Sequence, residues 1–147
     1  MFRIMKTLRP MVVLLLLAAG LSGCHRTPAE QQVREAIAAV AEAAEAGSAG
    51  SVGKALSEDF DGNQGELDRR GLLNMIRVLA LRGEHIGVTM GPVSVEPRGE
   101  RLVATFTVSL SSGSGGLLPD RLGVYQVETA WRQEQGDWHC YVASWKR

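Results

Sequence analysis

The sequence predicts an α+β domain, in which helices in the first half pack on one side of a curved antiparallel sheet of about four strands. Two observations support this prediction. Apolar residues recur at helical spacing as far as Gly83, and beyond it they alternate with polar residues at a period of two. The chain has 147 residues, enough for one domain with its own core and too few for two.

The first 23 residues have the three parts of a secretory signal. Arg3, Lys6 and Arg9 form a basic start without an acidic residue, and an uninterrupted apolar run covers residues 11–20. A helix that spans a membrane needs about 20 apolar residues, so this run is too short to be kept as one. We therefore expect the segment to be cleaved.

The cleavage region carries the residues LSGC at 21–24, which resemble the bacterial lipobox. In that motif the cysteine becomes the lipidated new N-terminus. The alternative is an ordinary secretory signal cut elsewhere, which would leave Cys24 as a free thiol. Because two or more acyl chains hold a protein stably at a membrane, the resemblance implies a lipid-anchored protein of the bacterial cell envelope. His25 stands where an aspartate commonly retains lipoproteins in the inner membrane, which favours the outer membrane, facing the periplasm.

The expected organisation is a signal peptide at residues 1–23, a short tether at 24–27 and one domain at 28–147. Without the signal peptide the chain has 124 residues, with 13 basic and 16 acidic side chains and a formal net charge of −3. This mildly acidic composition argues against nucleic acid as a partner, since nucleic acid requires a basic surface. If Cys24 carries lipid, Cys140 has no partner for a disulfide, and the fold must rest on packing.

The first helix is expected to begin at a capping box formed by Thr27 and Glu30, with Pro28 at the first helical position. It is expected to end at Gly47. Its apolar stripe is rich in alanine and its polar face is acidic, whereas membrane-surface helices have basic polar faces and bulky apolar anchors. The stripe is therefore predicted to face the core.

Two further helices are expected before the sheet. A short one covers about residues 51–56, and a longer one runs from about Asp68 to Arg82. Asp68 is the predicted N-cap of the longer helix, and Gly83 is its predicted stop.

Four strands are expected after Gly83. The first covers residues 85–97 and has a kink or bulge at Gly91–Pro92. The second covers residues 101–110. The last two, residues 123–134 and 137–147, are joined by a turn around residues 135–137.

Three segments resemble the nuclear transport factor 2-like superfamily, and small bacterial lipoproteins and secreted proteins are the nearest group. They are LSEDFDGNQGELDRRGL at 56–72, GGLLPDRLGVYQVETAWR at 115–132 and GDWHCYVASW at 136–145. The resemblance covers most of the chain after the signal peptide. It implies a cone in which the sheet curls around the long helix and leaves a pocket at its open end. Enzymes of this superfamily, such as the ketosteroid isomerases and polyketide cyclases, place an acid or base and an oxyanion donor in the pocket, whereas many other members only bind.

A calcium-like spacing occurs before the third helix but does not predict a metal site. Asp59, Asp61 and Asn63 match the first three ligand positions of a calcium loop. The glycine then falls one position late, at Gly65, and Arg70 replaces the bidentate glutamate. We expect a turn here, and neither a metal nor a cofactor is predicted.

The candidate site residues lie on or beside the last two strands. They are Asp120, Tyr125, Glu128, Arg132, His139 and Tyr141. Alternation places Tyr125 on one face of its strand and Glu128 and Arg132 on the other, so they cannot all meet in one pocket.

Catalysis would require a base together with a neutral donor, for example Tyr125 or Tyr141. A Glu128–Arg132 pair on an exposed sheet face explains these charges without chemistry, so no catalytic residue is predicted. The expected function is binding, either of a protein across the sheet or of a small apolar molecule in the cone. The alternative is a small isomerase or cyclase-like enzyme.

The last strand carries bulky side chains on both faces. Alternation puts Trp138, Cys140 and Val142 on one face and Tyr141, Ala143 and Trp145 on the other. An exposed apolar set of this kind commonly marks a partner surface. Since the superfamily often dimerises through its sheet, a homodimer is the first expectation.

The anchoring prediction is tested by Cys24→Ser. Without the thiol no acyl chain can be attached, so we expect the protein to move from the membrane pellet to the soluble fraction of a lysed cell. The wild-type chain, fractionated in parallel, is the control. Tight association of Cys24→Ser with washed membranes would show that Cys24 is not the anchor.

Overall fold

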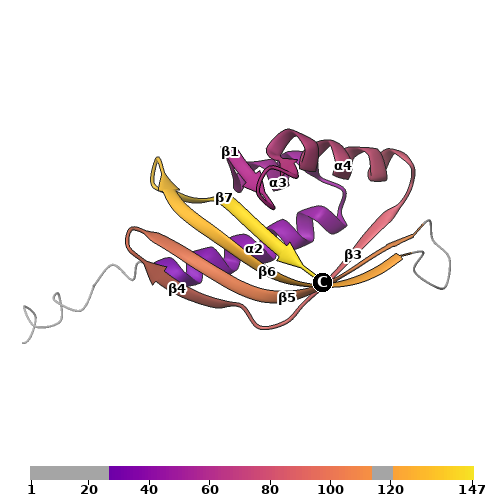
Figure 1. Cartoon of the computed structure of the whole chain (residues 1–147). Coiled ribbons are helices and arrows are strands. Elements are labelled where there is room, and N and C mark those ends of the chain that lie inside the picture. The colour runs from indigo at the N-terminus through magenta and orange to yellow at the C-terminus, as the bar shows by residue number, and fades with distance from the viewer. Residues whose placement is uncertain (1–26, 114–120) are drawn as a thin grey trace, which may run out of the picture.

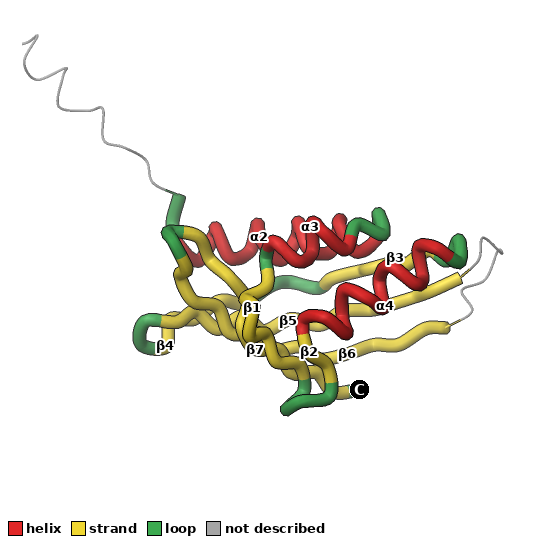
Figure 2. Tube along the Cα trace, turned by 90° about the horizontal axis from the view of Figure 1, so that it is seen from above, coloured by secondary structure: helices red, strands yellow, loops and turns green. Residues whose placement is uncertain are grey.

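The computed structural model describes residues 27–113 and 121–147, so Cys24 and Asp120 lie outside the described residues. In these two ranges no helix is both long and apolar enough to cross a membrane. The described chain forms three helices and one curved sheet, as Figures 1 and 2 show. The predicted α+β class is confirmed.

Helix α2 (Ala29–Glu45) is the long first helix, and it buries Val33 and Ile37 against the sheet. The predicted capping box is wrong. Pro28 is itself the N-cap, so Thr27 lies one residue outside the helix and no side chain caps the free N–H groups. The helix ends as predicted: Gly47 has a φ of +69°, and its neighbour Ser48 donates its N–H to the carbonyl of Ala43 at 2.8 Å.

Helices α3 (Ala49–Lys54) and α4 (Arg69–Leu81) follow. Asp68 caps α4 as expected, because its Oδ1 accepts the N–H of Gly71 at 2.7 Å. Gly83, with a φ of +69°, lies just beyond the end of this helix.

The sheet has seven strands, so the expectation of about four was wrong. The strands are β1 (Leu56–Gly62), β2 (Leu67–Asp68), β3 (His85–Met90), β4 (Ser94–Arg98), β5 (Arg101–Gly113), β6 (Arg121–Glu134) and β7 (Asp137–Lys146). Their order is β2-β1-β7-β6-β5-β3, and β4 also pairs with β5. Part of the difference is that the predicted first strand, residues 85–97, is two strands, β3 and β4, where only a kink or bulge at Gly91–Pro92 was expected.

The other added strands, β1 and β2, lie where a turn was expected. Strand β1 pairs with β7 in parallel, so the sheet is mixed and not wholly antiparallel. The pairing shifts register between Leu56 and Asp61, and this irregularity buries Leu56, Ser57 and Phe60 with no period of two. A segment without that period and rich in polar residues gives no strand signal.

The two long hairpins follow the prediction. Strands β5 and β6 pair over eleven residues without a break, and β6 and β7 are joined through Gln135 and Gly136. These two residues have φ values of +53° and +88°, the conformation of the two-residue turn that matches the twist of a hairpin.

Strand β7 contains one extra residue opposite β6. Cys140 pairs with Trp131, and Val142 pairs with Ala130, so Tyr141 is a bulge. The bulge reverses the alternation beyond it. Ala143 is buried on the core side, and Val142 is 38% exposed. The predicted division of this strand into two faces is therefore correct up to Tyr141 and wrong after it.

The helices lie on one side of the curved sheet. Helix α2 crosses the concave face, and α3 and α4 lie beside it (Figures 1 and 2). Helix α4 contacts β1 and β2 at one edge of the sheet and β3 at the other, so it bridges the two edges. Trp131, 2% exposed, is the largest fully buried side chain on the floor of the core.

The cap of α4 gives a stability test. Asp68→Ala should lower the free energy of unfolding by about 1 kcal/mol, because the N–H of Gly71 loses its acceptor. Asp68→Asn is the matched control, since asparagine caps about as well as aspartate. Urea unfolding of the two variants and the parent measures the difference, and equal stability of all three would contradict the capping role.

Candidate functional site

The inner part of the cone holds a cavity of about 270 Å³ between α2 and the concave face of the sheet. Among the described residues, its wall is apolar apart from the Thr129 hydroxyl, the Trp131 indole N–H and the Cys140 thiol. The lining includes Ile37, Val40, Ala41 and Ala44 of α2, Phe106 and Val108 of β5, Val127, Thr129 and Trp131 of β6, and Cys140 of β7. The cavity is therefore built from the residues that the strand and helix patterns direct inward.

These three polar groups already make hydrogen bonds within the protein. The Thr129 hydroxyl accepts the indole N–H of Trp131 at 2.8 Å and donates to the Ala104 carbonyl at 3.4 Å. The Cys140 thiol donates to the Val142 carbonyl, and burial raises the pKa of the Cys140 thiol to about 12. A thiol with that pKa stays protonated at neutral pH and is a poor nucleophile.

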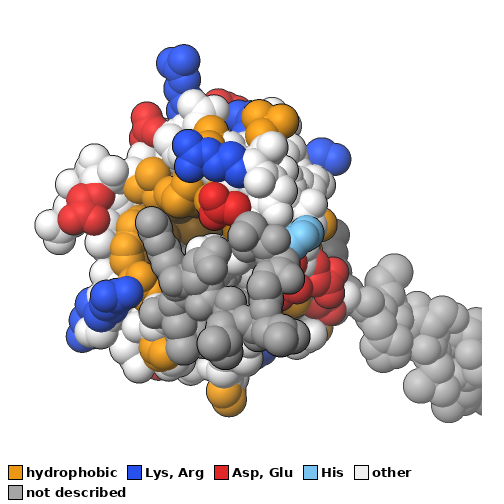
Figure 3. All heavy atoms as spheres, turned by 90° about the vertical axis from the view of Figure 1, so that its right-hand side faces the viewer, with side chains coloured by type: hydrophobic (Ala, Val, Ile, Leu, Met, Phe, Trp, Pro, Cys, Tyr) orange, Lys and Arg blue, Asp and Glu red, His pale blue; other side chains and the backbone are white. Residues whose placement is uncertain are grey.

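The cavity continues into a wider mouth of about 420 Å³. The two spaces share Phe60, Leu72, Val108, Leu110, Val127 and Ala143, so they form one continuous hollow. Four residues line the mouth and not the inner cavity: Leu67, Met75, Tyr125 and Trp145. Figure 3 shows apolar side chains around a hollow at this end of the molecule, with charged side chains of both signs on its rim.

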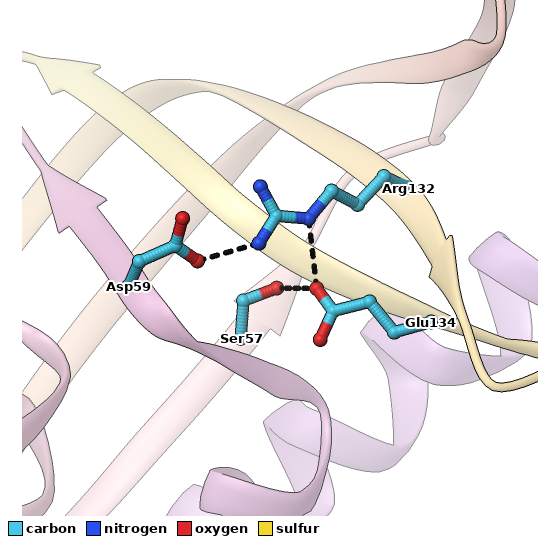
Figure 4. Close-up of polar contacts among 4 residues, drawn as sticks. All are labelled: Ser57, Asp59, Arg132 and Glu134. Carbon is cyan, nitrogen blue, oxygen red and sulfur yellow. Dashed lines mark hydrogen bonds and ion pairs between the residues drawn. The ribbon is translucent and has the colours of Figure 1, made fainter.

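A cluster of polar side chains lies on the convex face of the sheet, opposite the cavity, and Figure 4 shows it. Arg132 donates from Nη2 to Oδ1 of Asp59 at 2.6 Å and from Nε to Oε2 of Glu134 at 2.8 Å. The buried Ser57 hydroxyl donates to the same oxygen of Glu134. The guanidinium also stacks on the Tyr141 ring, 4.8 Å from its centroid. We call Ser57, Asp59, Arg132 and Glu134 the convex cluster.

The convex cluster links strands that are distant in sequence. Ser57 and Asp59 belong to β1, and Arg132 and Glu134 belong to β6. The hydrogen bond from Ser57, with the contribution of Arg132, lowers the pKa of Glu134, whereas partial burial opposes that shift. The Nε and Nη2 groups of Arg132 both donate to carboxylates of the cluster. The arrangement therefore resembles a link between two strands more than a binding site for an external anion.

The structure separates the sequence-predicted site residues. Tyr125 faces the mouth, whereas Glu128, Arg132, His139 and Tyr141 belong to the convex side or its edges. Arg132 and His139 are direct cross-strand neighbours. The predicted Glu128–Arg132 pair is wrong, because Arg132 binds Asp59 and Glu134. Asp120 lies outside the described residues.

Sequence reasoning missed Ser57, Asp59 and Glu134 as members of a cluster. The first two lie on β1, which the sequence did not predict as a strand, so nothing placed them beside Arg132. The signal that was available is local: Arg132 and Glu134 are two residues apart on one strand and therefore share a face.

The segment with calcium-like spacing comprises the end of β1, which carries Asp59 and Asp61, and the turn at residues 63–66 that leads to β2. Oδ1 of Asp61 accepts the N–H of Gly65 at 2.7 Å, and Oδ1 of Asn63 accepts the N–H of Trp145 at 2.9 Å. These oxygens stabilise the turn and attach it to β7. The described part of the chain contains no group of three histidine, cysteine or acidic side chains placed to hold a metal ion.

Comparison with solved structures defines the fold. A candidate dehydratase of the nuclear transport factor 2-like family from Streptomyces avermitilis is 18% identical, with a TM-score of 0.64 over 79% of this chain and 93% of its own. A nuclear transport factor 2-like protein from Cytophaga hutchinsonii is 11% identical, with a TM-score of 0.65 over 82% and 98%. One of unknown function from Pseudomonas putida is 14% identical, with a TM-score of 0.65 over 82% and 87%.

This chain therefore has the nuclear transport factor 2-like fold, which confirms the resemblance seen in the sequence. At these identities the likeness extends to the fold alone. No family profile and no curated protein sequence matches the chain. The homodimer through the sheet stays a prediction.

The convex cluster gives a pH test. Because the pKa of Glu134 is lowered in the folded state, its contribution to stability is present above the unfolded pKa, about 4.3, and is lost as the pH falls through the lower folded value. Glu134→Gln should therefore destabilise the protein at pH 7, and its difference from wild type should shrink from pH 5 towards pH 3.

Urea unfolding at each pH measures this difference. Glu100→Gln, which removes an exposed charge in the turn between β4 and β5, is the control. A Glu134→Gln difference that is the same at pH 7 and pH 3 would show that the ionised carboxylate does not stabilise the cluster.

Proposed function

We propose that this chain is a lipid-anchored binding protein of the bacterial cell envelope that holds a small apolar molecule in its cone. The observation that carries the proposal is the hollow itself, because the described residues of its inner wall offer apolar surface and no free polar group. Ligand pockets typically measure roughly 300–1,000 Å³ and have mostly apolar walls with few polar groups. The mouth, about 420 Å³, lies in that range, the inner cavity, about 270 Å³, lies just below it, and both have mostly apolar walls.

The wall also argues against the enzyme alternative. An isomerase-like reaction requires a base within hydrogen-bond reach of the substrate, and a donor for the developing oxyanion. Tyr125 supplies a hydroxyl at the mouth, but no aspartate, glutamate or histidine is among the described residues that line either space. Cys140 cannot substitute as a base, because its pKa is raised to about 12.

The proposed anchor would determine which way the mouth of the cone faces relative to the membrane. Helix α2 begins at Ala29, five positions after Cys24, so the domain would lie close to the bilayer. Figure 1 shows that α2 begins at one end of the molecule and that β6 begins at the other, where Tyr125 lines the mouth. The 17 residues of α2 separate the two ends by about 25 Å, and the mouth would therefore open away from the anchoring membrane.

Binding is tested by filling the cavity. The full-length chain carrying Cys24→Ser is purified without detergent and titrated with N-phenyl-1-naphthylamine, an uncharged dye that fluoresces in apolar surroundings. We expect saturable binding. We expect Ala41→Phe, which places a ring in the inner cavity, to weaken it at least about tenfold.

Ala38→Phe is the matched control, because it adds the same ring to an exposed position of the same helix. Circular dichroism and thermal unfolding show that both variants are folded. Equal binding by the two variants, or no saturable binding by the parent, would contradict the proposed cavity.

A further inference from the structure

The hollow is elongated along β6, and the mouth is its more polar end. Tyr125, Val127, Thr129 and Trp131 line it in sequence along one face of β6, with Tyr125 at the mouth and Trp131 at the inner end. The six residue steps from Tyr125 to Trp131 span about 20 Å in an extended strand. An apolar space that follows the strand over that length can hold an extended aliphatic chain.

The groups at the mouth are hydrogen-bond donors. Among the described residues lining the mouth, Tyr125 and Trp145 alone carry polar side-chain atoms. An indole N–H can only donate, and a phenol can donate. The guanidinium of Arg147 adds a cation, since its Cζ lies 5.7 Å from the centroid of the Tyr125 ring. Arg147 follows Lys146, the cross-strand partner of Gln126, so it stands beside Tyr125 at the end of β7.

The position of the Tyr125 ring depends on Gly123. A Cβ at Gly123 would lie 2.6 Å from Cε2 and 2.7 Å from the hydroxyl oxygen of Tyr125, closer than real Cβ contacts. The missing side chain therefore lets the ring lie flat along β6. In this position its hydroxyl makes no hydrogen bond with the rest of the described chain, whereas the ring supports Arg147.

From this arrangement we propose that the ligand is an aliphatic carboxylate, with its chain in the inner cavity and its carboxylate at Arg147 and Tyr125. This inference rests on the proposed function and names its ligand class. A carboxylate is an acceptor with two oxygens, so it matches a cation and a phenol that both donate. An apolar molecule without a head group would leave these donors unused.

The test measures the contribution of the ligand's head group separately from that of its alkyl chain. Decanoate and 1-decanol share an alkyl chain, and at pH 8 only decanoate is charged. Each displaces N-phenyl-1-naphthylamine from the Cys24→Ser chain in a competition titration. Arg147→Gln should raise the decanoate concentration needed for half displacement about fivefold and leave that of 1-decanol within twofold. Tyr125→Phe, which keeps the ring, should weaken decanoate more than 1-decanol, because the hydroxyl of the alcohol can also accept from the phenol but carries no charge.

Lys146→Gln is the matched control, because it removes an adjacent cation that borders the convex face. It should change neither titration. If Arg147→Gln and Tyr125→Phe leave decanoate unchanged, or weaken both competitors equally, the carboxylate assignment is wrong while the apolar cavity stands. If the dye does not bind the parent chain, the cavity and the carboxylate assignment fail together.

Discussion

The extra residue at Tyr141 determines what the sheet encloses. Cys140 pairs with Trp131 and Val142 pairs with Ala130, so regular alternation is interrupted between two core positions. A bulge increases local twist, which helps a long antiparallel pair to curl into a cone. It also turns Ala143 and Trp145 inward. Without it, Val142 would occupy the wall and Trp145 would leave the mouth.

The same irregularity determines how the domain is closed at its edge. Strand β1 runs parallel to β7 and shifts register opposite residues 140–142, so its two ends pair on either side of Tyr141. The convex cluster then connects β1 directly to β6 through Asp59 and Arg132. Since both side chains are partly exposed, their ion pair alone contributes little to the stability of the fold. The buried Ser57 contact makes the link more specific, because it positions Glu134 for the same guanidinium.

The elements that could be predicted from the sequence are those in which the buried residues recur at a regular spacing from end to end. Leu102, Ala104 and Trp131 follow simple alternation, and the long helices follow the spacing of Val33 and Ile37, so these elements could be assigned from sequence. Strand β1 and the second half of β7 could not, because each contains a break in register that only pairing partners reveal. The convex cluster was missed for the same reason. Tyr125 was a candidate from its strand, but its relation to Arg147 depends on the folded β6–β7 pair.

The fold admits enzymes and binding proteins, so function depends on which side chains enter the cone. In this chain the inner positions of β6 are Val127, Thr129 and Trp131, and the one hydroxyl among them is held by the indole N–H. Placing an ionised group there would require burying a charge without a partner, which costs far more than a hydrogen bond returns. The uncharged inner wall is therefore consistent with the proposal that a charged head group binds at the mouth, where solvent and Arg147 reduce that cost.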